Sequence, residues 1–317
     1  MSESVFGSDN VIVEQISEGN LKTYLVGFDI NDIGEKEYRW LNLINVLQEV
    51  IPEFAFGFHK NENIAISKAT PSFICEAAKA IYKIQEFEEV RRIYLELDSY
   101  IEDDDIKSKY LKRGEFGELV LHLLLRDFHH TIPLLSKIYF KDSFGATVHG
   151  FDAVHIQPET KTLWLGESKL YSDGKKGILA LVEDIVQHFN RDYMNDEFVL
   201  ISKKVELFGN IPEKDYWLNL MDKNAKLIDQ FESISIPLVC TYSSDLFGYY
   251  SDEKDPAFLN EYENEVRELK ALFDKHNKHQ LKPYLNIVLM LFPVKSKTEL
   301  VKKLHRRLAH LQVINDV

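Results

Sequence analysis

The fold is decided by two neighbouring stretches, GFDAVHI at residues 150–156 and TLWLGESKL at residues 162–170. Both are short, β-rich and apolar, and the Gln-Pro-Glu-Thr-Lys segment between them predicts a tight hairpin connection. With the turn centred in this segment, residues whose numbers add up to 319 lie opposite each other. Asp152 and Glu167 then become cross-strand neighbours, with Cβ atoms about 4.5–5.5 Å apart.

A third polar group joins these two carboxylates. Lys169 follows Glu167 by two residues and projects from the same face of its strand, whereas Ser168 points to the other face and is expected to pack. Two adjacent carboxylates repel each other, and the pKa of one rises unless a positive charge lies between them. Mg²⁺, with Mn²⁺ as a substitute, would meet this need, because Mg²⁺ takes one or two carboxylates and completes its shell with water and phosphate.

This arrangement would suit the cutting of phosphodiester bonds. A bound Mg²⁺ would stabilise charge on the phosphate and lower the pKa of an attacking water, and Lys169 would orient that water. Acid and lysine side chains on adjacent strands also form ordinary solvated pairs, so the spacing alone does not assign the chemistry. Two features favour the site. The residues beside Asp152 and Glu167 are apolar, and Glu118 interrupts a nearly apolar helix predicted over residues 114–125, where an unpaired carboxylate would be costly.

The predicted elements follow the order αβββαβ. After the helix of residues 114–125 come a first strand at 136–140, the two hairpin strands, a helix at 177–191 and a strand at 197–202. This order resembles the PD-(D/E)xK, or restriction-endonuclease-like, superfamily, which implies an α/β fold with a mixed central sheet. Its pattern has a helix-borne Glu, an Asp on the second strand and Glu-x-Lys on the third.

The resemblance implies a role for each matching residue. The superfamily pattern falls on Glu118, Asp152, Glu167 and Lys169, with the two acids and Glu118 holding the metal, and with Glu115 in reserve if the helix is shifted by a turn. Phe151 stands where the pattern has proline. Gln187 stands where many relatives carry a polar residue near the site, which makes it a candidate for substrate binding.

Three blocks resemble the HamA family, the nuclease subunit of the Hachiman anti-phage defence system. They are RGEFGE at residues 113–118, HGFD at residues 149–152 and GESK at residues 166–169. This resemblance implies a nuclease that works with a large superfamily 2 helicase, HamB, and degrades DNA when infection is sensed. The blocks lie within residues 105–205, and the flanks resemble that family only in overall layout.

The flanks predict an extension of the core on each side. Residues 1–104 predict an α+β region that could bind a partner, with the acidic run Asp98–Asp105 as its boundary, and residues 105–317 predict the nuclease core with a C-terminal αβ extension. The flanking strands are expected at 11–16, 21–30, 234–241 and 284–292, and the flanking helices at 38–50, 72–90, 215–230, 256–276 and 297–312.

The charge of the chain argues against strong DNA binding by this chain alone. The formal net charge is −13, whereas affinity for the DNA backbone comes mainly from Lys and Arg. Two basic segments stand out: residues 282–307, with seven basic residues and one acidic residue, and Lys175-Lys176, which begin a predicted helix and could hold a phosphate. Both also suit solvated surfaces. The acidic remainder is easier to understand if a partner delivers the DNA.

The cysteines and the apolar runs bear on where in the cell the protein is expected. Cys75 and Cys240 lie far apart inside apolar runs, which predicts small packed side chains in a reducing cytoplasm. No apolar run approaches the ~20 residues that span a bilayer, so no membrane partner is expected.

We therefore expect a Mg²⁺-dependent DNA nuclease. Two competing hypotheses stay open: a non-catalytic clamp or regulatory subunit of a helicase, and a nuclease that acts on RNA.

Overall fold

A computed structural model describes residues 4–57, 71–82, 92–96, 115–135, 150–207 and 211–313. The strands are β1 (Ile12–Ser17), β2 (Leu21–Val26), β3 (Phe28–Ile30), β4 (Lys36–Tyr38), β5 (Ile132–Leu135), β6 (Ala153–Gln157), β7 (Thr162–Tyr171), β8 (Ile234–Ser243) and β9 (Asn286–Val294). The main helices are α1 (Trp40–Phe56), α2 (Pro71–Tyr82), α4 (Glu115–Asp127), α6 (Gly174–His188), α7 (Arg191–Leu207), α8 (Lys214–Leu220), α9 (Leu227–Glu232), α10 (Leu246–Tyr249), α11 (Pro256–His276) and α12 (Lys297–Val313). Shorter helical turns are η1 (Ser8–Asn10), η4 (Arg92–Glu96) and η5 (Lys282–Tyr284).

One mixed sheet organises the molecule and confirms the predicted α/β class. Its seven strands run in the order β1-β2-β9-β8-β7-β6-β5, while β3 and β4 form a separate two-stranded sheet. The four central strands β2, β9, β8 and β7 are parallel to their neighbours in that group, and the pairs at both edges are antiparallel. The parallel strands β8 and β9 are buried along almost their whole length, as expected for strands covered on both faces.

The predicted hairpin register is confirmed. Ala153 pairs with Gly166 and Gln157 pairs with Thr162, so opposite residues do add up to 319. The strands are joined by a turn at residues 158–161, in which Lys161 takes a left-handed backbone conformation with a φ of 52°. Asp152 lies in a bend one residue before the first paired residue of β6.

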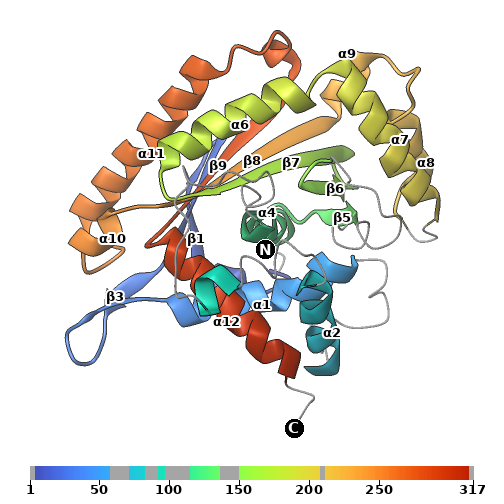
Figure 1. The fold of residues 1–317 in the computed structure, drawn as a ribbon. Coiled ribbons are helices and arrows are strands. Elements are labelled where there is room, and N and C mark those ends of the chain that lie inside the picture. Colours follow the sequence, from blue (N-terminus) through green and yellow to red (C-terminus); the bar gives the residue numbers. More distant parts are fainter. Residues whose placement is uncertain are drawn as a thin grey trace.

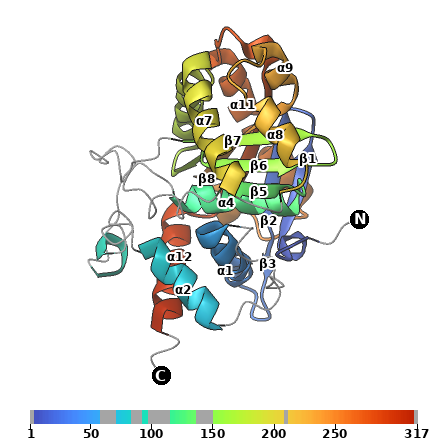
Figure 2. The same cartoon turned by 90° about the vertical axis from the view of Figure 1, so that its right-hand side faces the viewer.

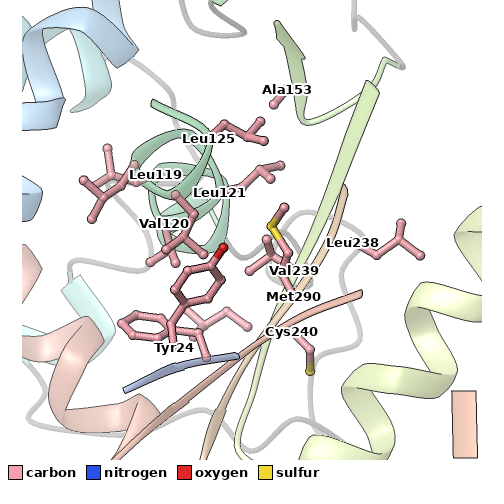
Figure 3. Packing of buried hydrophobic residues seen from close by; sticks show 14 of the residues in the cluster. Tyr24, Leu119, Val120, Leu121, Leu125, Ala153, Leu238, Val239, Cys240 and Met290 are labelled. Atoms are coloured by element: carbon pink, nitrogen blue, oxygen red, sulfur yellow. The ribbon is translucent and has the colours of Figure 1, made fainter. Parts of the chain in front are cut away.

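Helices cover both faces of the sheet. Helices α6 and α11 lie over one face, and α4, α1 and α12 lie under the other (Figure 1). The turned view separates α1, α2 and α12 from α7 and α11 in the same way (Figure 2). Side chains of the central strands alternate between these layers: Val239 and Met290 point towards α4, whereas Leu238 and Cys240 point away from it (Figure 3).

The N-terminal segment shares this sheet with the C-terminal one. Strand β2 pairs in parallel with β9, from Leu21 opposite Leu289 to Thr23 opposite Leu291. The expected strands at 11–16 and 21–30 and the expected helix at 38–50 are confirmed as β1, β2 with β3, and α1. Helix α2 lies in the first part of the expected helix at 72–90; the rest of that helix and the acidic run Asp98–Asp105 are outside the described residues.

Most of the strands and helices expected after residue 190 are confirmed, and one expected strand is wrong. Strands β8 and β9 and helices α11 and α12 lie where they were expected, and the expected helix at 215–230 is divided into α8 and α9. The expected strand at 197–202 is instead part of α7. Buried residues of α7 recur at helical spacing, as Met194, Phe198, Ile201 and Val205, which explains why this β-rich run forms a helix.

The last strand of the expected αβββαβ order is wrong, and its first strand is not tested. The first strand expected at 136–140 lies outside the described residues, and β5 comes just before it in the chain. Since residues 197–202 are helical, the next strand of the sheet is β8, which follows α6, α7, α8 and α9 and pairs in parallel with β7.

Two smaller expectations concern the cysteines and the membrane. Cys75 and Cys240 are both buried, free thiols. Across the described part of the chain, none of the helices combines the length and the apolar character needed to cross a bilayer.

Candidate functional site

Strand β7 presents Glu167 and Lys169 to the layer of α6. In the parallel register Glu167 lies opposite Leu238 and Lys169 opposite Cys240, and those two partners point away from α4 (Figure 3). Cys240 meets α6, since a Cβ atom built on Gly177 would lie 2.5 Å from its Sγ. Paired residues of neighbouring strands share a face, so the expected common orientation of Glu167 and Lys169 is present.

Asp152 is held by the residue between these two. The Oδ2 atom of Asp152 accepts hydrogen bonds from the backbone N–H and from the hydroxyl of Ser168, each at 2.9 Å. The expectation that Ser168 only packs is therefore wrong, because its hydroxyl fixes the Asp152 carboxylate. This contact is possible because Asp152 lies in the bend before β6, where its side chain can reach the backbone of β7.

Glu167 is the most perturbed carboxylate of the group. It is 2 % exposed, and its Oε1 atom lies 2.6 Å from Nδ1 of His188 at the end of α6. Burial and the negative charge of Asp152 raise the pKa of Glu167 to about 7, against the opposing effect of His188. Burial lowers the pKa of His188, but the hydrogen bond and charge of Glu167 raise it above its ordinary value.

Lys169 has a partner on the same helix. Its Nζ atom lies 2.5 Å from Oδ2 of Asp184. Burial would lower the pKa of Lys169, but the carboxylates of Asp184, Asp152 and Glu167 raise it well above the ordinary lysine value. The amine therefore stays protonated at neutral pH. Burial raises the pKa of Asp184 as well, and Lys169 opposes that effect.

Aromatic rings enclose the imidazole of His188. The ring of Tyr193, in α7, is stacked on it with centroids 4.5 Å apart and an interplanar angle of 13°. Phe151, the residue before Asp152, meets the rings of His188, Phe189 and Tyr193 at centroid distances of 6.3, 5.2 and 5.7 Å. Phe151 thus packs the Asp152 segment against the end of α6.

Helix α4 approaches from the other face of the sheet. A Cβ atom built on Gly117 would lie 3.4 Å from the hydroxyl of Ser168, the group that holds Asp152, and Glu118 is the next residue of this helix. Glu118 is buried and shares a helical stripe with His122 and Arg126. Its place in a metal shell stays a prediction. Glu115 begins α4, and its side chain lies outside the described residues.

The weaker substrate-binding candidates lie apart from one another. Lys175 and Lys176 are exposed in the first turn of α6, ~20 Å along the helix from His188 at 1.5 Å per residue. Their backbone N–H groups donate to Oδ1 of Asp173 at 2.8 and 3.4 Å, so the capping carboxylate already occupies the position considered for a phosphate. Gln187 is exposed beside His188.

Sequence reasoning missed two residues of this cluster, Asp184 and His188. The available signal was their spacing of four on the helix that follows the Glu-x-Lys strand, which places both on one helix face. Gln187, the candidate for substrate binding on this helix, is exposed, and the contact with β7 is made by its neighbour His188.

The donor set can be compared with the needs of a metal ion. Within the described ranges, no three or more His, Cys, Asp and Glu side chains form a group suited to a metal ion. Two carboxylates are nevertheless enough for Mg²⁺, which fills most of its octahedron with water and substrate oxygen atoms. The pKa of Glu167 is raised by its own burial and by the negative charge of the half-buried Asp152, and a bound cation would relieve this repulsion. Asp152 and Glu167 therefore fit Mg²⁺.

Comparisons with known proteins identify one family. A model of the family described as HamA matches residues 4–308. No curated protein and no solved structure matches the chain.

Proposed function

The chain belongs to the HamA family of Hachiman anti-phage defence proteins, and from this premise we propose that it is a Mg²⁺-dependent nuclease that hydrolyses phosphodiester bonds in DNA. One observation carries the proposal: the buried Glu167 lies close to the half-buried Asp152, with the pKa of Glu167 raised to about 7, beside a lysine that stays protonated. Perturbed, crowded acids of this kind are a mark of functional sites.

Each side chain has a chemical task in this proposal. Asp152, fixed by Ser168, and Glu167 would hold the metal, with Glu118 of α4 as the third ligand. When bound, Mg²⁺ would supply positive charge to the phosphate and a water of lowered pKa. Lys169 carries a full charge and donor hydrogens only, so it would orient the attacking water or offset phosphate charge rather than accept a proton.

The charge of the chain supports control by a partner. A net charge of −13 weakens the attraction of this chain for the DNA backbone. We propose that a large superfamily 2 helicase of the HamB type delivers the DNA. Without this partner, weak DNA binding would keep the nuclease inactive. Strong, salt-sensitive DNA binding by the isolated chain would contradict this part of the proposal.

The proposal is tested by cleavage of plasmid, single-stranded DNA and matched RNA in Mg²⁺. Wild type is compared with Glu167→Ala, Lys169→Ala and the exposed control Glu183→Gln, each alone and with the helicase and ATP. We expect cleavage of DNA by wild type and by the control, and a loss of ~100-fold or more in the two site variants. Equal cutting by all four proteins would indicate another site or a contaminant.

Two outcomes would select the competing hypotheses. Cutting of RNA in preference to DNA would make the protein a ribonuclease, since the site does not distinguish the sugar. No cutting with any substrate or partner would favour a non-catalytic clamp in a helicase complex.

A further inference from the structure

Two matched polar contacts join α6 to the candidate site. Glu167 meets His188 and Lys169 meets Asp184, at 2.6 and 2.5 Å. The partners on α6 are four residues apart, about 5–6 Å between their Cβ atoms, and the partners on β7 are two residues apart, about 6.6 Å. Since the two spacings nearly match, one face of α6 can hold both side chains at once.

The two contacts are buried enough to matter. The exposed fractions of the side chains are 3 % for Glu167, 14 % for Asp184 and 21 % for both Lys169 and His188. Charges with so little solvent are costly unless they are paired, so each side chain on β7 depends on its partner on α6.

The position of α6 is fixed by close packing. A Cβ atom built on Gly177 would lie 2.5 Å from Sγ of Cys240, and one built on Gly174 would lie 2.9 Å from Cδ2 of Tyr242. The absence of side chains here lets the helix approach the sheet, which brings the short side chain of Asp184 within reach of Lys169. At the other end, Tyr193 and Phe151 hold the ring of His188 in place.

We infer that Asp184 and His188 are positioning residues of the proposed nuclease site: Asp184 holds the Lys169 amine away from the metal-binding carboxylates, and His188 holds the Glu167 carboxylate and competes with the cation for it. This inference rests on the proposed function. It assigns the two side chains opposite effects on metal binding, which a merely structural role would not produce.

The opposite effects follow from charge. Without Asp184, the Lys169 ammonium would turn to Glu167 or Asp152 and take the place of the cation. Asp184→Asn is therefore expected to weaken Mn²⁺ binding about tenfold, since one displaced ion pair of about 1.4 kcal/mol corresponds to that factor. Without the imidazole, Glu167 loses its competing cation, so His188→Gln is expected to tighten Mn²⁺ binding roughly threefold to tenfold while slowing cleavage.

The first experiment is calorimetric titration of the full chain with Mn²⁺. Wild type, Asp184→Asn and His188→Gln are compared with two exposed controls, Glu183→Gln on α6 and His276→Ala on α11. The controls are expected to stay within twofold of wild type. Equal affinity in all five proteins, or a weakening in both site variants, would overturn the inference.

The second experiment needs no metal. Double-mutant cycles in urea denaturation, Lys169→Met with Asp184→Asn and Glu167→Gln with His188→Gln, measure each contact directly. We expect a coupling of about fivefold or more in the unfolding equilibrium constant for both pairs. Additive effects would refute the contacts. Failure of wild type to bind Mn²⁺, with coupling intact, would instead reject the proposed metal site, so the two failures are distinguishable.

Discussion

Two glutamate–histidine pairs, each with a buried glutamate, lie on opposite faces of the same sheet. Under the sheet, Glu53 of α1 meets His122 of α4 at 2.8 Å, and above it Glu167 of β7 meets His188 of α6 at 2.6 Å. Both glutamates are almost fully buried. Judged by this contact alone, the two pairs would be given the same role.

Their surroundings separate them. Burial would raise the pKa of Glu53, but His122 and Arg126 lower it below the ordinary value, with Nε of Arg126 only 2.7 Å away. Burial and Asp152 raise the pKa of Glu167 to about 7. Glu53 is next to His122 and a positively charged arginine, whereas Glu167 is next to His188 and a second carboxylate. The comparison teaches that a surplus of buried negative charge, rather than a buried ion pair, marks the candidate site.

The largest expected effect is the loss of stability when Glu53 is neutralised. Glu53→Gln would leave Arg126 buried beside a neutral side chain, so we expect the free energy of unfolding to fall by about 3–5 kcal/mol in urea denaturation. The matched control is Glu49→Gln, one turn earlier on α1, with an expected change within about 1 kcal/mol. A loss as small as that of the control would break the comparison.

The next effect is the pH dependence of stability without metal. The folded pKa of Glu167 is raised, so its contribution is fully present below its unfolded pKa of about 4.3 and is lost as pH rises through about 7. We expect a loss of about 3–4 kcal/mol over this window, from about 1.4 kcal/mol per pKa unit. Glu53 has a lowered pKa, so its contribution is present above about 4.3 and is lost as pH falls through the folded value.

Denaturation at a series of pH values tests these opposite slopes. Glu167→Gln should remove the loss of stability between pH 5 and 8. It should leave unchanged the loss of stability that Glu53 causes at acid pH. If the variant retains the neutral slope, the titration belongs to another group.

The smallest expected effect is stabilisation by the metal. At an Mg²⁺ concentration tenfold above its dissociation constant, binding to the folded state adds about 1.4 kcal/mol. We expect a matching rise in the melting temperature of wild type and of Glu183→Gln, and none in Glu167→Gln. A rise of equal size in Glu167→Gln would locate the ion elsewhere.

The hairpin was predictable because its signals are local. The turn at residues 158–161 and the alternation on both strands fix the register, which is observed from Ala153 opposite Gly166 to Gln157 opposite Thr162. Asp152 lies one residue before the first of these pairs. The start of α11 was predictable for the same reason, since Pro256 begins it after the capping residue Asp255.

The errors arose where the deciding information lay outside a short window. The run of residues 197–202 is β-rich, yet the helical pattern of α7 becomes visible only over Met194 to Val205. The hydroxyl of Ser168 reaches Asp152 because the chain bends before β6, and no pattern in the sequence indicates that bend. Asp184 and His188 depend on how closely α6 approaches β7, a tertiary distance that two glycines set.

The pairing of β2 with β9 carries a practical consequence for dissecting the protein. A fragment that starts after residue 104 would expose the edge of β9, a parallel strand buried on both faces, with unpaired backbone groups and a row of apolar side chains. Such edges recruit other chains and aggregate. Insolubility of that fragment would thus report a missing neighbour in the sheet, and a split protein should regain solubility when residues 1–104 are supplied as a separate chain.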